Sequence, residues 1–188
     1  MTRSSFLNRL FGQPPVEKAA STTYLALVAQ ARSPRFYRDW QVPDTLDGRF
    51  DMIVLHVALM IRRIKKGPGA APDADRDGFN QALFDYMFND MDRSLREIGV
   101  TDLGVGKRVK QMAAAFYGRA EAYQSALDAG DGAAVEEALA RNVYRKGEAD
   151  PQSVAALARY CETLAQALED QPLAELLKGV VTFPVAEG

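Results

Sequence analysis

The sequence predicts an all-α protein, a single-domain helical bundle of about seven helices with no sheet. Three observations indicate this class. Apolar residues recur at helical spacing in most segments, Gly and Pro separate these segments, and no pair of segments has the pattern of a β-hairpin. With 188 residues, 47% of them hydrophobic and 26% charged, the chain has the composition of one globular domain. We expect the all-α domain to span residues 21–178.

The two ends of the chain are expected to differ from this domain. Residues 1–20 contain basic and apolar side chains without the long apolar core of a secretory signal. They are expected to form a flexible or amphipathic N-terminal segment, and the two alternatives are a frayed terminus and a loose contact with a membrane surface. Residues 179–188 are expected to form an extended tail that lies over the core.

Two helices are expected before the most hydrophobic part of the chain. Residues 22–32 have an apolar stripe at helical spacing, preceded by Ser and Thr residues that can cap a helix. Ser33 and Pro34 fit the N-cap and the first position of a short second helix, which carries aromatic residues as far as Trp40.

The most hydrophobic stretch lies between Met52 and Ile61, where nine of ten residues are apolar. A helix that crosses a membrane needs about 20 consecutive apolar residues, and this run stops at Arg62. We therefore expect the central core helix of a bundle, with Asp44 or Thr45 as its N-cap.

A long antiparallel pair is expected next. Residues 67–78 have the Gly, Pro and Asp content of a loop, and residues 79–98 and 105–127 have the apolar stripes of two helices. The glycines between the two helices are expected to bend the chain. A Gly within a helix costs about 1 kcal/mol relative to Ala, so Gly118 is expected to mark the close approach of another helix.

The last third of the chain continues the helical pattern. Residues 131–144 have inward-facing apolar positions at helical spacing, and Asp150 with Pro151 can start a further helix. Pro172 ends that helix, and residues 173–178 are expected to form a short final turn.

No motif of catalysis or cofactor binding is complete in this sequence. Cys161 is the only Cys and His56 the only His, which excludes an internal disulfide, a cysteine metal cluster and bis-histidine haem ligation within the chain. We expect both to be structural, and we expect no metal and no cofactor. An enzyme with a pocket near Trp40 and His56 remains a third hypothesis behind the two binding functions described below.

The segment at Gly104 to Lys107 resembles part of a phosphate-binding loop but does not satisfy its pattern. That pattern requires a Gly where Thr101 stands and a Ser or Thr where Arg108 stands, after a strand.

Charge is distributed unevenly along the chain. Residues 1–66 carry 11 basic and 5 acidic side chains, a net charge of +6, and residues 67–188 carry 12 and 20, a net charge of −8. Basic residues also gather on both sides of the connection at 99–106; they are Arg93, Arg96, Lys107, Arg108, Lys110 and Arg119. Such an end would suit phosphate or lipid headgroups, and an ordinary solvated end is the other interpretation.

Two long stretches resemble the ubiquinol–cytochrome c chaperone family, which assists assembly of the cytochrome bc1 complex. They are FYRDWQVPDTLDGRFDMIVLHVALMIRR at Phe36–Arg63 and FNDMDRSLREIGVTDLGVGKRVKQMAAAFYGRAEAY at Phe88–Tyr123. The resemblance extends over most of Tyr24–Arg145. It implies a non-enzymatic chaperone that binds newly made cytochrome b, without catalytic residues, and the short chain without a transit peptide looks like a bacterial-type member.

A client surface is expected on the antiparallel pair of helices. Residues 79–98 have more apolar positions than one buried stripe requires, and surfaces rich in Met adapt to varied partners. The residues expected to line the client groove are Phe84, Phe88, Met91, Tyr117 and Tyr123, with a rim of Arg93, Arg96, Lys107 and Arg108. The alternative is that the whole stripe is core, in which case Phe84, Phe88 and Met91 would all be fully buried.

The second functional hypothesis is an α-helical module that docks on RNA or a ribosome through its basic end. The aromatic residues interleaved with basic ones in RNA-recognition modules are missing. In either case we expect a cytoplasmic protein, with peripheral contact at the inner face of the membrane left open, and we expect neither DNA nor a small-molecule substrate.

Overall fold

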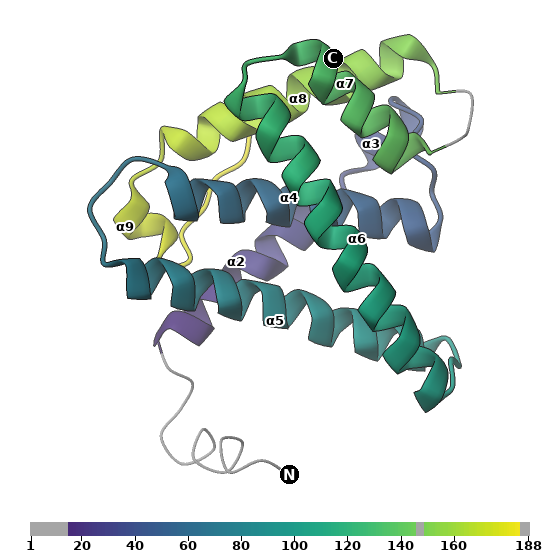
Figure 1. The fold of residues 1–188 in the computed structure, drawn as a ribbon, viewed down its shortest axis with the longest axis horizontal. Helices are drawn as coiled ribbons and strands as arrows, with labels where there is room; N and C mark the ends of the chain where they lie inside the picture. Colours follow the sequence, from purple (N-terminus) through teal and green to yellow (C-terminus); the bar gives the residue numbers. More distant parts are fainter. Residues whose placement is uncertain (1–14, 146–148, 185–188) are drawn as a thin grey trace.

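The described part of the chain, residues 15–145 and 149–184 of a computed structural model, consists of helices and connections without a strand (Figure 1). The predicted all-α class is confirmed. The elements are α2 (Pro15–Ala31), α3 (Pro34–Arg38), α4 (Leu46–Lys66), α5 (Asp73–Glu97), α6 (Asp102–Asp128), α7 (Gly132–Leu139), a π-helical turn (Ala140–Tyr144), α8 (Pro151–Glu169) and α9 (Leu173–Leu176).

Helix α4 is the centre of the bundle. It runs through the middle of Figure 1, with α5 below it, α6 crossing it in front and α8 above it, and it contacts α2, α5, α6 and α8. Every residue from 51 to 60 is buried. No helix among the described residues has the length and hydropathy needed to cross a membrane. The prediction of a core helix is therefore confirmed.

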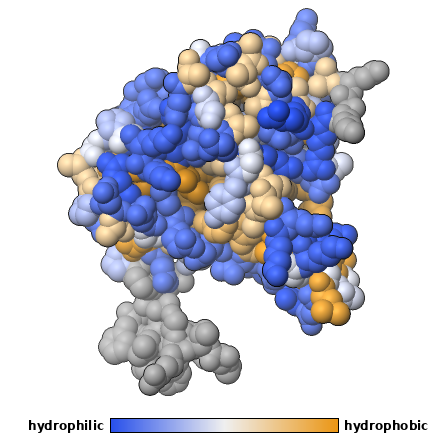
Figure 2. Space-filling view, viewed as in Figure 1, coloured by the Kyte–Doolittle hydropathy of each residue, from blue (hydrophilic) through white to orange (hydrophobic). Residues whose placement is uncertain are grey.

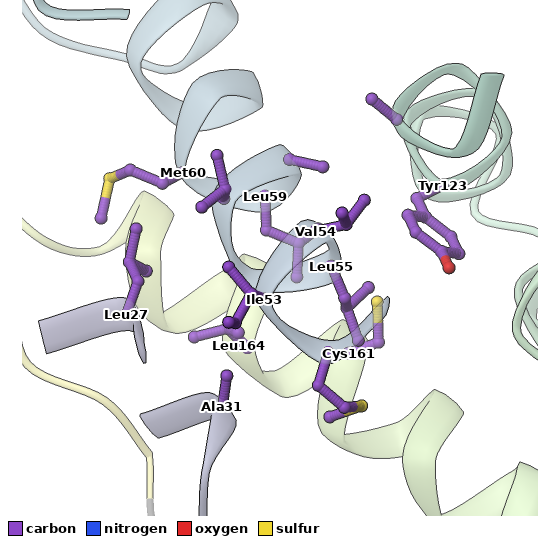
Figure 3. Packing of buried hydrophobic residues seen from close by; sticks show 14 of the residues in the cluster. Leu27, Ala31, Ile53, Val54, Leu55, Leu59, Met60, Tyr123, Cys161 and Leu164 are labelled. Carbon is purple, nitrogen blue, oxygen red and sulfur yellow. The ribbon is translucent and has the colours of Figure 1, made fainter. Parts of the chain in front are cut away.

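Apolar side chains from three other helices pack around α4 (Figure 3). Leu27 and Ala31 of α2, Tyr123 of α6 and Cys161 of α8 surround it, and all four are wholly buried. Burial of apolar area contributes about 25 cal/mol per Å², so the buried run at residues 51–60 of α4 stabilises this fold.

Three helices begin earlier than the sequence pattern predicts. Helix α2 starts at Pro15 instead of Thr22, α5 at Asp73 instead of Phe79, and α6 at Asp102 instead of Val105. In each case an acidic residue in the first turn, Glu17, Asp75 or Asp102, favours the positive end of the helix. Pro15 also suits the first position of α2.

The first of these corrections changes the role of the Ser and Thr residues near the predicted start of α2. Their hydroxyl groups do not cap a helix, since Ser21 and Thr22 donate to the carbonyl of Lys18 within α2. Residues 15–20 therefore belong to the bundle. Residues 1–14, and with them most of the proposed amphipathic segment, lie outside the described residues, and the division into domains stays a prediction.

Within the described ranges, three helices begin with a side-chain cap. Thr45 accepts from the Gly48 amide at 3.1 Å at the start of α4, which decides between the two predicted caps, because Asp44 instead pairs with Arg49. Asp131 caps α7 at 3.0 Å and Asp150 caps α8 through the Ser153 amide at 3.0 Å. Each such cap contributes about 1 kcal/mol.

The glycines of α6 do not have the predicted roles. Gly104 and Gly106 lie in the first turns of α6 and not in the bend before it. A Cβ atom added at Gly118 would meet no atom within 4 Å, so no helix approaches closely there and that prediction was wrong.

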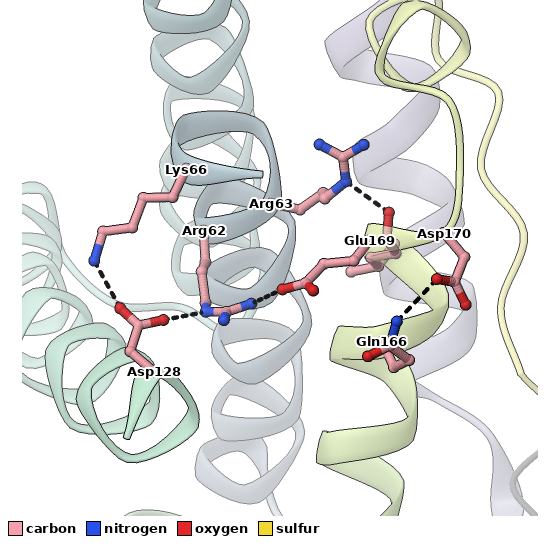
Figure 4. Close-up of polar contacts among 8 residues, drawn as sticks. Arg62, Arg63, Lys66, Asp128, Gln166, Glu169 and Asp170 are labelled. Carbon is pink, nitrogen blue, oxygen red and sulfur yellow. Dashed lines mark hydrogen bonds and ion pairs between the residues drawn. The ribbon is translucent and has the colours of Figure 1, made fainter. Parts of the chain in front are cut away.

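Charged side chains in the last turns of α4 connect this helix to α6 and α8 (Figure 4). Arg62 lies between Asp128 of α6, at 2.8 Å, and Glu169 of α8, at 2.7 Å, and Lys66 also pairs with Asp128. The buried Arg63 donates to the carbonyl of Leu168, at 2.7 Å, and so satisfies an acceptor that the end of α8 leaves free.

The described part of the tail lies against the bundle. Thr182 donates its amide to Gln171 at 2.8 Å, and the side chains of Val181 and Phe183 pack against the core. Residues 185–188 lie outside the described residues.

Candidate functional site: an aromatic patch beside an arginine-lined cleft

Four aromatic rings from α5 and α6 form a cluster, which we call the aromatic patch: Phe84, Phe88, Phe116 and Tyr117. Phe84 and Phe88 are one helical turn apart, with ring centroids separated by 4.5 Å. Tyr117 stacks on Phe84 at 5.5 Å, and the Phe116 ring meets Phe84 edge-on at 5.4 Å. The mutual packing of the rings holds the patch in one arrangement.

The patch is partly open to solvent. Phe116 is buried, Phe84 and Phe88 are partly buried, and Tyr117 is 62% exposed. Figure 2 shows hydrophobic surface where α6 crosses α4 and α5, framed by hydrophilic side chains. Partial exposure of Phe84 and Phe88 excludes the interpretation that the whole stripe of α5 is core.

A cleft of about 490 Å³ lies between the start of α4, the second half of α5 and α6. Its apolar lining comes from all three helices and consists of Leu46, Phe50, Ile53, Met91, Leu95, Met112 and Ala115. Five arginines also line it: Arg32, Arg49, Arg108, Arg119 and Arg145. Asp47, Ser94 and Gln111 complete the lining.

Two of these arginines are paired with Asp51, a wholly buried residue of α4. Arg119 approaches one carboxylate oxygen at 3.0 Å and Arg145 the other at 3.0 Å, and Arg145 also contacts Asp47 at 2.9 Å. Burial raises the pKa of Asp51 to about 6, although the two arginines act in the opposite direction. The ion pairs connect α4 and α6 to the residue that follows the π-helical turn.

The backbone at Arg145 has a φ of 57°, in the left-handed region that a residue with a side chain rarely adopts. Such a conformation costs about 1 kcal/mol or more, and the contacts with Asp47 and Asp51 offset that cost. The turn therefore directs this guanidinium group towards the cleft.

Arg32 and Arg108 differ from the other cleft arginines. Neither forms an ion pair with another residue of the described chain, whereas Arg49, Arg119 and Arg145 each do. Both side chains are exposed. Their charges are available to a ligand.

The structure separates the residues predicted to line one groove. Phe84, Phe88 and Tyr117 lie in the aromatic patch, while Met91 and Arg108 line the cleft. Tyr123 is wholly buried beside α4 and cannot contact a client, because it belongs to the inward stripe of α6 with Phe116 and Ala120.

Two of the four residues of the predicted basic rim are paired with neighbouring acids. Arg93 pairs with Asp90, and Arg96 pairs with Asp92 at 2.6 Å and with Asp102. Lys107 is exposed on α6 and does not line the cleft. Arg108 is thus the only predicted rim residue found in the cleft lining.

His56 has a structural environment. Its Nδ1 lies 2.7 Å from the carbonyl oxygen of Met52 and its Nε2 lies 2.8 Å from the hydroxyl of Tyr160, which also accepts from Gln30 at 2.9 Å. Both ring nitrogens are therefore bonded, and burial lowers the pKa of His56 to about 4. Burial also raises the pKa of the Cys161 thiol to about 12, which disfavours a reactive thiolate.

No group of three or more His, Cys, Asp or Glu residues within the described ranges is arranged to hold a metal ion. Four cleft arginines were missing from the predicted client groove: Arg32, Arg49, Arg119 and Arg145. Arg119 was predicted only as part of the basic set around residues 99–106. The other three come from parts of the sequence far from α5 and α6, and no spacing in the sequence connects them.

Comparison with known proteins agrees with this architecture. The model of the ubiquinol–cytochrome C chaperone family matches residues 38–183. The crystal structure of the Cbp3 homolog from Brucella abortus superposes with a TM-score of 0.81 at 34% sequence identity, covering 98% of both chains. No match was found among functionally curated proteins. The family match over most of the chain and the shared fold show that this protein belongs to the ubiquinol–cytochrome c chaperone family.

Proposed function

We propose that this chain is a non-enzymatic chaperone that binds newly made cytochrome b and assists assembly of the cytochrome bc1 complex. The family assignment supports an assembly chaperone. The observation that carries the binding role is the aromatic patch, which leaves Phe84, Phe88 and Tyr117 partly exposed.

The patch has the properties required of a surface that receives an apolar segment. Aromatic rings contribute large contact areas at little conformational cost, and they are enriched at the energetic centres of interfaces. The rings of this patch are already ordered by contacts with one another, so binding would require little further ordering. Its partial burial limits the apolar surface exposed when no client is bound.

The direct test is capture of cytochrome b by the tagged full-length protein from cells that make the bc1 complex. The variant Tyr117→Gln removes the most exposed ring of the patch and keeps a residue with good helix propensity. We expect it to reduce the recovered cytochrome b, and the double variant Phe84→Gln/Tyr117→Gln to reduce it by at least about tenfold, as expected for the loss of an interface centre.

Leu25→Gln provides the matched control. Leu25 is 67% exposed on α2, outside the aromatic patch, so its replacement removes a similar amount of exposed apolar surface elsewhere. Thermal unfolding of each variant shows whether it is folded. Full recovery of cytochrome b with the folded double variant, or an equal loss with Leu25→Gln, would contradict the proposed surface.

Docking on RNA or a ribosome has less support than client binding. Asp90, Asp92 and Asp102 neutralise Arg93 and Arg96 at the end where the basic surface was expected. A cytoplasmic location and contact with the membrane face stay predictions.

A further inference from the structure

The arginine-lined cleft is a second site, distinct from the aromatic patch in shape and in charge. The patch is a cluster of rings that is partly open to solvent, whereas the cleft is a concave space between three helices. Its volume of about 490 Å³ lies within the range of about 300–1,000 Å³ typical of small-molecule sites. Protein interfaces are in general broader and flatter, so a small ligand fits this cleft better than a folded partner.

Charge indicates an anionic ligand. Five arginines and one carboxylate, Asp47, line the cleft. Two further carboxylates, Asp44 and Asp51, pair with Arg49 and Arg119. When these two are counted together with Asp47, the five arginines exceed the carboxylates by two positive charges. The excess corresponds to the two arginines without an ion-pair partner among the described residues, Arg32 and Arg108.

The guanidinium groups favour an oxyanion in particular. Arginine presents paired N–H donors in a planar fork that matches a carboxylate or a phosphate. Arg119 and Arg145 are held in place by Asp51, which makes this side of the cleft rigid before any ligand enters.

The apolar part of the lining imposes a second requirement on the ligand. Leu46 is exposed and Met112 and Ala115 are partly exposed, so they leave apolar surface open in the cleft. The buried side chains of Phe50, Ile53, Met91 and Leu95 complete the apolar lining. A free inorganic anion would leave this surface without a partner. A ligand that fills the cleft must therefore combine an oxyanion with an aliphatic portion.

We propose that this cleft binds an anionic amphiphile, with a phosphate or carboxylate headgroup at Arg32 and Arg108 and an aliphatic chain against the apolar lining. This site does not depend on the proposed binding of cytochrome b, since none of the exposed residues of the aromatic patch lines the cleft.

Isothermal titration calorimetry of the full-length protein tests the chemistry of the ligand. The probes are octyl phosphate, octanoate, octanol and inorganic phosphate, with the two anionic amphiphiles kept below micelle-forming concentrations. We expect one molecule of octyl phosphate or octanoate to bind per chain, and the tighter of the two identifies the headgroup. Failure of both to bind would overturn the proposal, as would equal affinity for inorganic phosphate or for octanol.

Variants test the location. Arg108→Ala removes an exposed cleft arginine, and we expect affinity for the anionic probe to fall about tenfold, as for the loss of one charge-assisted hydrogen bond. Ala115→Met fills the cleft from α6 and is expected to abolish binding even though every arginine is retained.

Lys110→Ala is the matched control, because Lys110 is an exposed cation of α6 that does not line the cleft. The affinity of the Lys110→Ala variant for the anionic probe is expected to equal that of the original protein. Thermal unfolding without ligand establishes that each variant is folded. Unchanged binding in folded Ala115→Met, or equal losses in Arg108→Ala and Lys110→Ala, would place the ligand elsewhere and overturn the proposal.

Discussion

Replacement of His56 by Gln is expected to remove a pH dependence of folding stability. The carbonyl of Met52 can only accept a hydrogen bond, so Nδ1 of His56 carries the proton and Nε2 accepts from the hydroxyl of Tyr160. A second proton on Nε2 would turn that acceptor into a donor. The Tyr160 hydroxyl already accepts from Gln30, and it would lose the acceptor for its own proton.

The magnitude follows from the change in pKa. Burial lowers the pKa of His56 from 6.5 to about 4, so the unfolded chain binds a proton between these values and the folded chain does not. The corresponding stability is fully present above pH 6.5 and is lost as the pH falls towards 4. The pKa difference corresponds to about 3 kcal/mol, a large part of the stability of an ordinary domain.

Urea unfolding monitored by the fluorescence of Trp40, the only Trp, gives the measurement. The free energy of unfolding is compared for the original protein and His56→Gln at pH 7.5 and pH 4.5, since other titrating groups contribute equally to both proteins. The original protein is expected to lose about 2.5 kcal/mol more than the variant on acidification. An equal loss in the two proteins would refute the assignment of His56 as a buried neutral group.

Two other substitutions give further predictions. Asp51→Asn is expected to remove a pH dependence of opposite sign to that of His56. Burial raises the pKa of Asp51 from 3.8 to about 6, so the stability that this group contributes to the original protein is present below pH 3.8 and is lost as the pH rises through 6. Urea unfolding from pH 4 to pH 7.5 tests this, and a difference between the two proteins that does not change with pH would contradict it. Gly118→Ala is expected to stabilise α6 by about 1 kcal/mol, because a Cβ atom there meets nothing within 4 Å. A lower melting temperature would show that Gly118 has a role not visible in its surroundings.

The candidate site was predictable where it depends on spacing within one helix. Phe84 and Phe88 are four residues apart, so their contact follows from helical geometry, and Arg108 follows from its place near the start of α6. Arg32, Arg49 and Arg145 were not predictable, since only the packing of α2, α4 and the π-helical turn brings them to one cleft.

The errors in helix boundaries have a local cause. The pattern of residues 67–78 was interpreted as a loop from its Gly, Pro and Asp content, but Asp73 and Asp75 stand in the first turn of α5, where acidic side chains are favourable. The same residue types favour a loop and a helix start, and the sequence pattern does not distinguish the two.

The sequence by itself determined the helical class, the central position of α4 and the start of α8 at Asp150 and Pro151. These features depend on periodicity, length and contacts between near neighbours. Tertiary structure alone decided which residues of an apolar stripe remain exposed. Phe84 and Tyr123 both belong to such stripes, yet Phe84 is partly open and Tyr123 is wholly buried, because burial depends on how far the crossing helices cover each face. The arginine-lined cleft has the same origin, in the oblique crossing of α6 over α4 and α5.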